Sequence, residues 1–153
     1  MARLEDFDPT SRKHLTEMSM PVFAATPWTS AKPAPQARVA IVSTAGLQLR
    51  GDRPFAAGAG DFRPIPGDAT AGDLVMSHVS TNFDRSGFQA DINVVFPIDR
   101  LNELRRDGVI GSVASIHYSF MGATPPERIE QPARQLAGLL KQDRVDCVLL
   151  VPV

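Results

Sequence analysis

Two of the three histidines, His78 and His117, lie near the ends of apolar runs that are typical of β-strands. Imidazole titrates near neutral pH, so a histidine can act as a general acid or base. In open α/β sheets, ligand and catalytic sites gather at the ends of the strands. A lone histidine there is more often a hydrogen-bonded structural residue, so both roles stay open for His78 and His117. His14 lies in a peripheral polar stretch and is expected to be solvated.

Small polar residues follow the first apolar run, residues 39–42. Ser43, Thr44 and Gly46 stand where the carboxyl end of a first parallel strand would build a ligand loop. Neither this "STAG" segment nor the later "GVIGS" is a P-loop or a complete dinucleotide-binding fingerprint. Ser43 also lacks the sequence context of a hydrolase nucleophile. The segment is a candidate ligand loop, but it predicts neither nucleotide binding nor serine hydrolysis.

Three aspartates, Asp84, Asp91 and Asp99, follow His78 within a short span. The spacing of the aspartates and histidines matches no structural zinc or calcium motif, so no metal site is predicted. Asp99 precedes "RLNEL" and is expected to cap a helix there. Cys147, the only cysteine, excludes an internal disulfide and lies inside an apolar run. It is expected to be a buried small hydrophobe and not a redox nucleophile.

Strands are predicted for the apolar runs at residues 39–42, 74–79 and 145–153. The segment "VIGSVASIHYSFMG" predicts another strand, broken by polar residues at its end, and "INVVFP" predicts a further extended piece. Residues 51–74 are rich in glycine, proline and aspartate. A loop of this length in a compact domain usually contacts a ligand or a partner.

Helices are predicted between these strands. An N-cap at Asp8 or Thr10 predicts a short peripheral helix, and a longer helix is expected from Pro126, with Pro132 threatening its first turns. Strands alternating with helices predict a three-layer α/β fold with a mostly parallel sheet, Rossmann-like or flavodoxin-like. Residues 1–37 are interpreted as an N-terminal helix and a proline-rich connector, and residues 38–153 as the α/β domain.

The charge balance excludes several classes of function. The chain has 16 basic and 17 acidic side chains and a formal net charge of -1. This balance gives no support to nucleic-acid binding or to a membrane-surface role. The N-terminus lacks the profile of a secretory signal, and no apolar run approaches transmembrane length. A soluble cytoplasmic protein is therefore expected.

The final run, "VDCVLLVPV", predicts a strand buried on both faces. A parallel strand of this kind needs a helix or another molecule over each face. We therefore expect either a partner or a second copy to cover it, or the chain to be the incomplete front part of a longer protein.

Several long segments together resemble one family. They are "VAIVSTAGLQLRGDRPF", "GDFRPIPGD", "SHVSTNFDRSGFQADINVVFPIDRLNELRRDGVIGSVASIHYSFMG" and "VDCVLLVPV", and they cover the chain from about Arg38 to Val153. They resemble the selenoprotein B family, the selenoprotein subunits of glycine, sarcosine and betaine reductases and of D-proline reductase. The family places a selenocysteine, or a cysteine in its stead, just beyond a strand like "VLLVPV". The resemblance therefore implies that the nucleophile follows Val153, where a UGA codon could have been taken as a stop.

The resemblance implies reductive cleavage of a carbon–nitrogen bond in a small amino acid or amine. A pyruvoyl group on a partner subunit would hold the substrate, and a selenolate or thiolate would displace the nitrogen. This chain alone would be inactive and would carry no cofactor of its own. The implied catalytic residues are His78 and His117. The implied substrate-binding residues are Ser43, Thr44, Gly46 and Ser119.

Two other interpretations stay open. The chain could be a non-catalytic α/β module that binds a small molecule or a partner subunit, in which case a stable oligomer would cover the last strand. It could also be a family relative with altered reductive chemistry that uses cysteine. The fold does not select the substrate, because function depends on the site.

Overall fold

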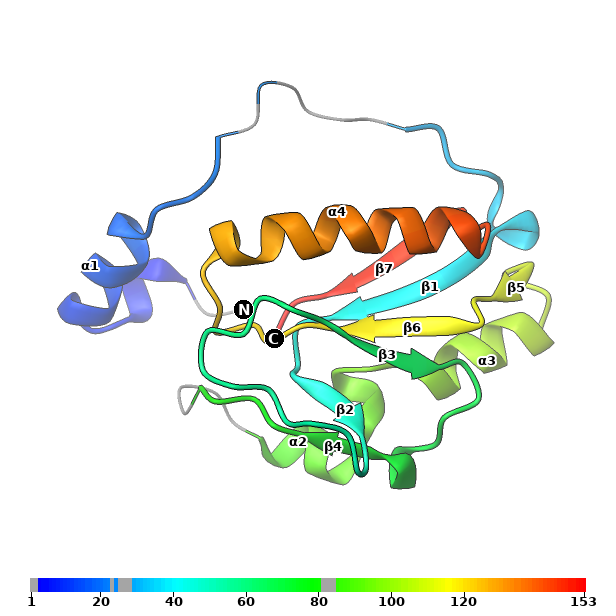
Figure 1. Ribbon diagram of the computed structural model, residues 1–153, viewed down its shortest axis with the longest axis horizontal. Helices are drawn as coiled ribbons and strands as arrows, with labels where there is room; N and C mark the ends of the chain where they lie inside the picture. Colours follow the sequence, from blue (N-terminus) through cyan, green and yellow to red (C-terminus); the bar gives the residue numbers. More distant parts are fainter. Residues whose placement is uncertain (1–2, 23, 25–28, 81–84) are drawn as a thin grey trace.

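The computed structural model describes residues 3–22, 24, 29–80 and 85–153. The fold is mixed α/β, with a mostly parallel sheet and helices packed against it (Figure 1). The main sheet consists of β1 (Arg38–Ser43), β3 (Arg63–Pro66), β5 (Ser112–Val113), β6 (Ile116–Ser119) and β7 (Cys147–Val151). A second, two-stranded antiparallel sheet pairs β2 (Leu47–Leu49) with β4 (Leu74–Met76).

Strand β1 lies at the centre of the parallel part of the sheet. It pairs in parallel with β7 on one side and with β5 and β6 on the other. Strand β3 pairs antiparallel with β6 and forms the far edge. Strand β1 therefore has β7 on one side and, on the other, β5 and β6, which come one after the other in the chain. This arrangement brings the carboxyl ends of β1, β6 and β7 to one edge of the sheet.

Helices cover both faces of the sheet: α4 (Pro126–Gln142) lies on one face, and α2 (Ser86–Ala90) and α3 (Ile98–Arg106) lie on the other. Helix α1 (Pro9–Glu17) has no buried residue and belongs to neither face. The 3₁₀ turns are η1 (Leu4–Asp6), η2 (Ala34–Gln36), η3 (Ala71–Asp73) and η4 (Ile92–Val94). Two hydrophobic clusters result. One joins Val39 and Ile41 of β1 to α2, η4 and α3, and the other joins Val42 to α4. Neighbouring residues of β1 thus enter opposite clusters, as the alternation of a strand requires.

Helix α4 continues from Pro126 to Gln142 although Pro132 lies inside it. Proline has no N–H, so the carbonyl of Arg128, four residues earlier, loses its helical donor. Gly60 approaches this carbonyl so closely that a Cβ on residue 60 would overlap the Arg128 oxygen. The expected disturbance of the first turns does not occur, and a glycine is required at position 60.

The last strand differs from its prediction. Strand β7 is an edge strand, with Leu149 40% and Leu150 70% exposed, and Cys147 is exposed. The predictions of a strand buried on both faces and of a buried cysteine are wrong, because β1 is the only strand that pairs with β7 among the described residues. Apolar composition alone does not distinguish a central strand from an edge strand.

Two local predictions are also corrected. Residues 92–97 are not extended, because η4 occupies Ile92–Val94. Asp99 is not an N-cap, because α3 begins at Ile98. Instead, the Asn93 side chain accepts the N–H of Asp99 at 3.0 Å and donates to the Asp99 carboxylate at 2.9 Å. The cap expected at Asp8 is confirmed, since its carboxylate accepts the N–H groups of Thr10 and Ser11.

Among the described residues, none of the helices combines the length and the apolar character needed to span a bilayer.

Candidate functional site

Thr44 joins the ends of three strands at the carboxyl edge of the sheet. Its N–H donates to the Val151 carbonyl at 3.0 Å, and its carbonyl accepts the Gly122 N–H at 2.8 Å. Its hydroxyl accepts the Val153 N–H at 2.8 Å and lies 3.2 Å from the Val153 carbonyl oxygen, to which it can donate. Thr44 thus fixes the backbone that follows β6 and β7 against the end of β1.

Gly46 brings a fourth segment to this edge. Its φ of +66° is a left-handed conformation that favours glycine. A Cβ on residue 46 would lie 3.0 Å from both the N and Cα atoms of His78. The Gly46 carbonyl also accepts the Ser77 N–H at 2.9 Å. The absence of a side chain on Gly46 therefore allows the residues after β4, including His78, to pack against the end of β1.

His78 extends its imidazole across the strand ends. The side chain is 5% exposed, and its Nδ1 accepts the Ser80 N–H at 3.2 Å. That hydrogen bond assigns the proton of the neutral ring to Nε2. A Cβ on Gly122 would lie 3.1 Å from Nε2 and 2.9 Å from the Thr44 carbonyl oxygen. His78, Thr44 and Gly122 therefore meet at the carboxyl edge, and we call these three residues with Gly46 the carboxyl-edge site.

Arg85 places a positive charge beside this site. Its guanidinium donates to the His78 carbonyl at 2.9 Å and to the Ser80 carbonyl. Burial lowers the pKa of His78, and the charge of Arg85 lowers it further. The imidazole is therefore neutral at pH 7 and can donate through Nε2.

His117 lies elsewhere, inside the core. It is fully buried on β6, and its Nδ1 accepts the Ile41 N–H of β1 at 3.0 Å. The Phe96 ring packs edge-on against it with centroids 5.8 Å apart. Burial lowers the pKa of His117 to about 4, with an opposing effect of Asp143. The structure does not bring His117 to the strand ends beside His78.

Ser43 and Ser119 face one another across β1 and β6, and both are fully buried. The Ser43 hydroxyl donates to the Val95 carbonyl at 2.8 Å and accepts the Ala45 N–H at 3.2 Å. The Ser119 hydroxyl accepts the Leu47 N–H at 2.9 Å. Both hydroxyls are thus engaged by the backbone, and they hold the turn between β1 and β2 under the carboxyl-edge site.

Two residues of this region had no role in the sequence interpretation. Gly122 follows β6 in the quoted "HYSFMG" segment, and a glycine directly after a strand is a signal for close backbone approach. Arg85 gave no local signal, because its position depends on the fold around His78. Asp84 lies outside the described residues. Within the part of the chain that the structure describes, no group of histidine, cysteine, aspartate or glutamate could hold a metal ion.

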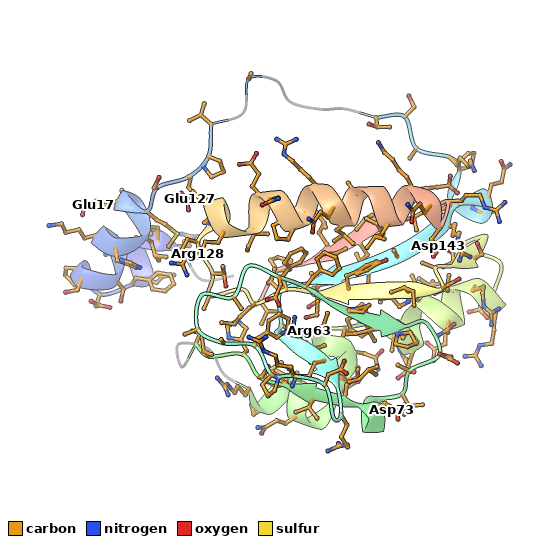
Figure 2. All side chains as sticks on the ribbon, viewed as in Figure 1. Glu17, Arg63, Asp73, Glu127, Arg128 and Asp143 are labelled. Atoms are coloured by element: carbon orange, nitrogen blue, oxygen red, sulfur yellow. The ribbon has the colours of Figure 1, made fainter. Side chains whose placement is uncertain are left out.

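Thr44, Gly46, His78 and Gly122 come from separate segments that meet at one end of the sheet. Figure 2 shows the described side chains on the ribbon. Fold and site together define an α/β domain whose candidate site lies at the carboxyl ends of parallel strands, where such sheets bind ligands. The chain belongs to the glycine/sarcosine/betaine reductase selenoprotein B family, which it matches over residues 9–153. This match includes α1 and the connector, which the resemblance from Arg38 onward left out.

The chain is similar to subunits of several reductase complexes. It is 35% identical over 139 residues to D-proline reductase subunit gamma of Acetoanaerobium sticklandii, covering 88% of this chain and 57% of the relative. It is 30% identical over 147 residues to glycine reductase complex component B subunit gamma of Symbiobacterium thermophilum, covering 90% of this chain and 33% of the relative. A betaine reductase complex component B subunit beta of Peptoclostridium acidaminophilum is 32% identical over 77 residues, covering 50% of this chain and 18% of the relative. The chain therefore spans only part of the length of these relatives, and no solved structure matches it.

Proposed function

We propose that this chain forms one wall of the active site in a reductase-complex subunit that cleaves a carbon–nitrogen bond of a small amino acid or amine. The observation that carries the proposal is the buried, neutral His78 at the meeting point of three strand ends. The relatives named as subunits of D-proline, glycine and betaine reductases support the substrate class.

The nucleophile of this proposal lies outside residues 1–153. Cys147 is the only cysteine, and it pairs with Val39 at the start of β1, whereas His78 lies beyond the carboxyl end of β1. We therefore assign the attack to a selenolate or thiolate supplied by another segment or subunit. A pyruvoyl group on a partner subunit would hold the amine and withdraw electrons from the carbon under attack.

The residues of this chain have two roles in that step. As the nucleophile forms its bond to carbon, the carbon–nitrogen bond breaks and its electron pair leaves on nitrogen. The proton that this nitrogen needs would come from the Nε2–H of His78, which the residues after β6 enclose in this chain and which the assembled complex must open to the substrate. The positive charge of Arg85 favours the anionic form of the approaching nucleophile. Thr44, Gly46 and Gly122 position the imidazole.

The assembled complex of full-length subunits tests the proposal through His78→Gln. Loss of a general acid lowers turnover by roughly 10²- to 10⁴-fold. His14→Gln is the matched control, because His14 lies on exposed α1. Amine or ammonia release is measured with thermal unfolding of each variant. Wild-type turnover by a folded His78→Gln complex would exclude the proposed role.

A partner-binding module without catalysis is the second candidate. The exposed Leu150 on edge strand β7 favours it, because an apolar strand edge is a surface suited to another chain. In this case His78→Gln would leave turnover intact, while Leu150→Glu would impair assembly of the complex. The third interpretation is a family relative that breaks a different bond by the same reductive chemistry. Turnover of other small substrates by the complex would favour it.

We further propose that the sheet is flavodoxin-like or otherwise Rossmann-like. The support is the position of β1 between β7 and the pair β5 and β6, all parallel to it, with α4 as the crossover between β6 and β7. In flavodoxin-like sheets the ligand binds at the switch point beside the first strand. An experimental structure of the whole subunit would test this strand order.

A further inference from the structure

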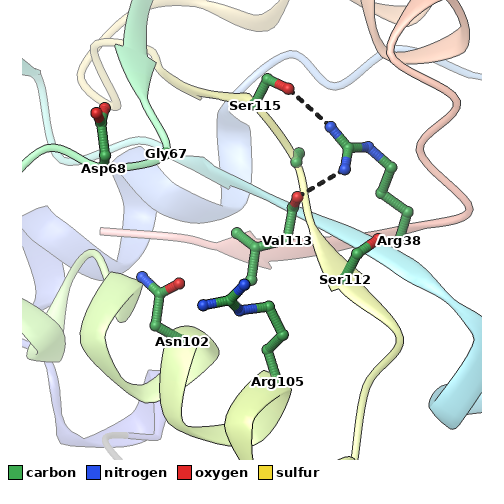
Figure 3. A pocket seen from close by; sticks show the side chains of 9 residues that line it. Arg38, Gly67, Asp68, Asn102, Arg105, Ser112, Val113 and Ser115 are labelled. Carbon is green, nitrogen blue, oxygen red and sulfur yellow. Dashed lines mark hydrogen bonds between the residues drawn. The ribbon is translucent and has the colours of Figure 1, made fainter.

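Two polar regions of the fold take no part in the proposed function. One is a cavity where the parallel strands begin, in which the Arg38 guanidinium donates to the Val113 carbonyl and the Ser115 hydroxyl, each at 2.8 Å (Figure 3). These bonds tie β1 to the neighbouring strands. The other is the side chain of Gln48, the middle residue of β2, which is 3% exposed. A buried amide is unfavourable unless it finds a polar partner, so Gln48 needs one inside the fold.

The antiparallel pairing of β2 with β4 supplies this partner. Gln48 lies opposite Val75, so Ser77, two residues further along, is its diagonal neighbour on the same face. The Ser77 hydroxyl donates to Gln48 Oε1 at 2.5 Å. Its oxygen also lies 3.4 Å from the Gly46 carbonyl oxygen, a longer contact for the same hydroxyl hydrogen. The hydrogen of the Ser77 hydroxyl is therefore engaged by Gln48.

The Ser77 hydroxyl also holds the loop that follows β2. It accepts the Phe55 N–H at 2.9 Å. The Phe55 ring is buried, and the Arg63 guanidinium lies over it, 4.4 Å from the ring centroid. Because the hydroxyl donates to Gln48, its lone pairs are left to accept from Phe55. Gln48 thus sets the orientation of a hydroxyl that joins this loop to the residues after β4.

Ser77 directly precedes His78, so restraints on Ser77 fix the backbone from which the imidazole projects. Two restraints on His78 come from residues after it in the chain, the Ser80 N–H on Nδ1 and the Arg85 guanidinium on its carbonyl. The restraints before it are the Ser77 N–H on the Gly46 carbonyl and the Ser77 hydroxyl on Gln48. Loss of the bond to Gln48 would leave only the main-chain bond of Ser77 on that side.

We propose that Gln48 is a positioning residue for His78 and that it acts through the Ser77 hydroxyl. It keeps the imidazole aimed at Gly122 and Thr44. The inference rests on the proposed function only for its effect on turnover, because the state of the imidazole can be measured without a reaction.

The first test is the tautomer of His78, measured at neutral pH by two-bond proton–nitrogen NMR of the protein with nitrogen-labelled histidine and assigned with His78→Gln. The Nε2–H form is expected to dominate in the wild type, because Nδ1 accepts the Ser80 N–H. In Gln48→Met and in Ser77→Ala the Nδ1–H form is expected to rise at least about threefold, because the imidazole is held less firmly. Gln48→Glu keeps an acceptor oxygen and is expected to restore the wild-type tautomer.

The second test is turnover by the assembled complex of full-length subunits. Gln48→Met and Ser77→Ala are each expected to lower kcat at least about tenfold and to leave KM within about twofold, because neither residue contacts substrate. Gln48→Glu is expected to restore kcat to within about threefold of the wild type. The double variant is expected to lose no more than either single variant, since both changes remove the same hydrogen bond.

Two controls separate positioning from general stability. Leu136 is buried in the cluster that joins Val42 to α4, on the other face of the sheet. Leu136→Val is expected to lower the thermal stability and to leave the His78 tautomer and kcat unchanged. Gln135→Met repeats the chemical change of Gln48→Met at an exposed position of α4 and is expected to have no effect.

A wild-type tautomer in the folded Gln48→Met and Ser77→Ala proteins would overturn the inference, and so would an equal change in Leu136→Val. A changed tautomer with wild-type turnover would support the positioning of the imidazole and would contradict the proposed role of His78 as an acid. Ser77→Ala removes one oxygen after the end of β4, so it decides the question if Gln48→Met does not fold.

Discussion

Gly122 occupies the position directly in front of the His78 imidazole. A Cβ on residue 122 would lie 3.1 Å from Nε2, 2.9 Å from the Thr44 carbonyl oxygen and 2.5 Å from the Val153 carbonyl oxygen. Two of these three neighbours are backbone atoms, which cannot rotate away as a flexible side chain can. The carboxyl edge is therefore packed tightly enough that one methyl group would displace the strand ends.

Gly122→Ala is expected to destabilise the protein by about 1 to 3 kcal/mol, because the added methyl group must move backbone at the ends of β1 and β7. Urea unfolding followed by circular dichroism measures the change. Gly138→Ala is the matched control, since a Cβ on residue 138 of α4 would have no neighbour within 4 Å. That change should stabilise the helix by up to about 1 kcal/mol. Equal effects of the two substitutions would contradict the proposed crowding.

Arg38→Met is expected to lower the free energy of unfolding by about 2 to 4 kcal/mol, because it leaves a half-buried carboxylate without its partner. Burial raises the pKa of Asp143, but hydrogen bonds from Arg38 and Ser115 outweigh it and hold this pKa below its ordinary value. The ion pair joins the start of β1 to the end of α4 at 2.6 Å. The same denaturation experiment measures the loss.

The control for Arg38 is Arg134→Gln. Arg134 pairs with Glu130 one turn away on the exposed face of α4. Such surface pairs contribute about 0.3 to 0.5 kcal/mol. A loss of stability from Arg38→Met as small as that from Arg134→Gln would show that the ion pair of Arg38 with Asp143 does not stabilise the fold.

His117 is expected to make the protein less stable in mild acid. Its pKa falls from 6.5 to about 4 on folding because burial disfavours the charged ring. The folded state then binds fewer protons than the unfolded state, so stability is full above pH 6.5 and declines as the pH falls toward 4. The total decline is on the order of 3 kcal/mol.

Denaturant titrations at several pH values between 6.5 and 4 measure this dependence. His117→Gln keeps a polar side chain but cannot titrate, so its stability should vary less with pH over the same interval. The carboxylates contribute equally to both proteins and cancel in the comparison. Parallel curves for wild type and His117→Gln would rule out a lowered pKa.

Cys147 is expected to react with a thiol reagent such as Ellman's reagent in the native protein, because it is exposed at the start of edge strand β7. Native labelling should approach the rate in denaturant within about tenfold, and Cys147→Ser should change stability by less than about 0.5 kcal/mol. Complete protection of the thiol until the protein unfolds would show that Cys147 is buried, as the sequence predicted.

Much of the central sheet could be predicted from local sequence. The run at residues 39–42 lies within β1, and the helix expected from Pro126 begins there. Strand β3 was hidden inside the loop prediction, because Pro64 and Pro66 are unfavourable in a strand interior and are tolerated here at the sheet edge.

The candidate site was less predictable. His78 and His117 have similar local contexts, but the pairing of β6 with β1 and β3 places His117 inside the core. Ser43 and Ser119 are brought together by the register of two strands that are distant in sequence. Only the three-dimensional pairing tells which polar residues hold the backbone and which face the strand ends.

The hydrogen bond from the Ile41 amide to the His117 imidazole gives one strand amide an unusual chemistry. Amide hydrogens generally exchange with solvent more slowly as the solution becomes mildly acidic. At Ile41, however, acid would protonate the acceptor itself and remove the bond that protects the hydrogen. A deuterium-exchange profile would therefore show this one position in the middle of β1 losing protection in acid while its neighbours on the same strand keep theirs.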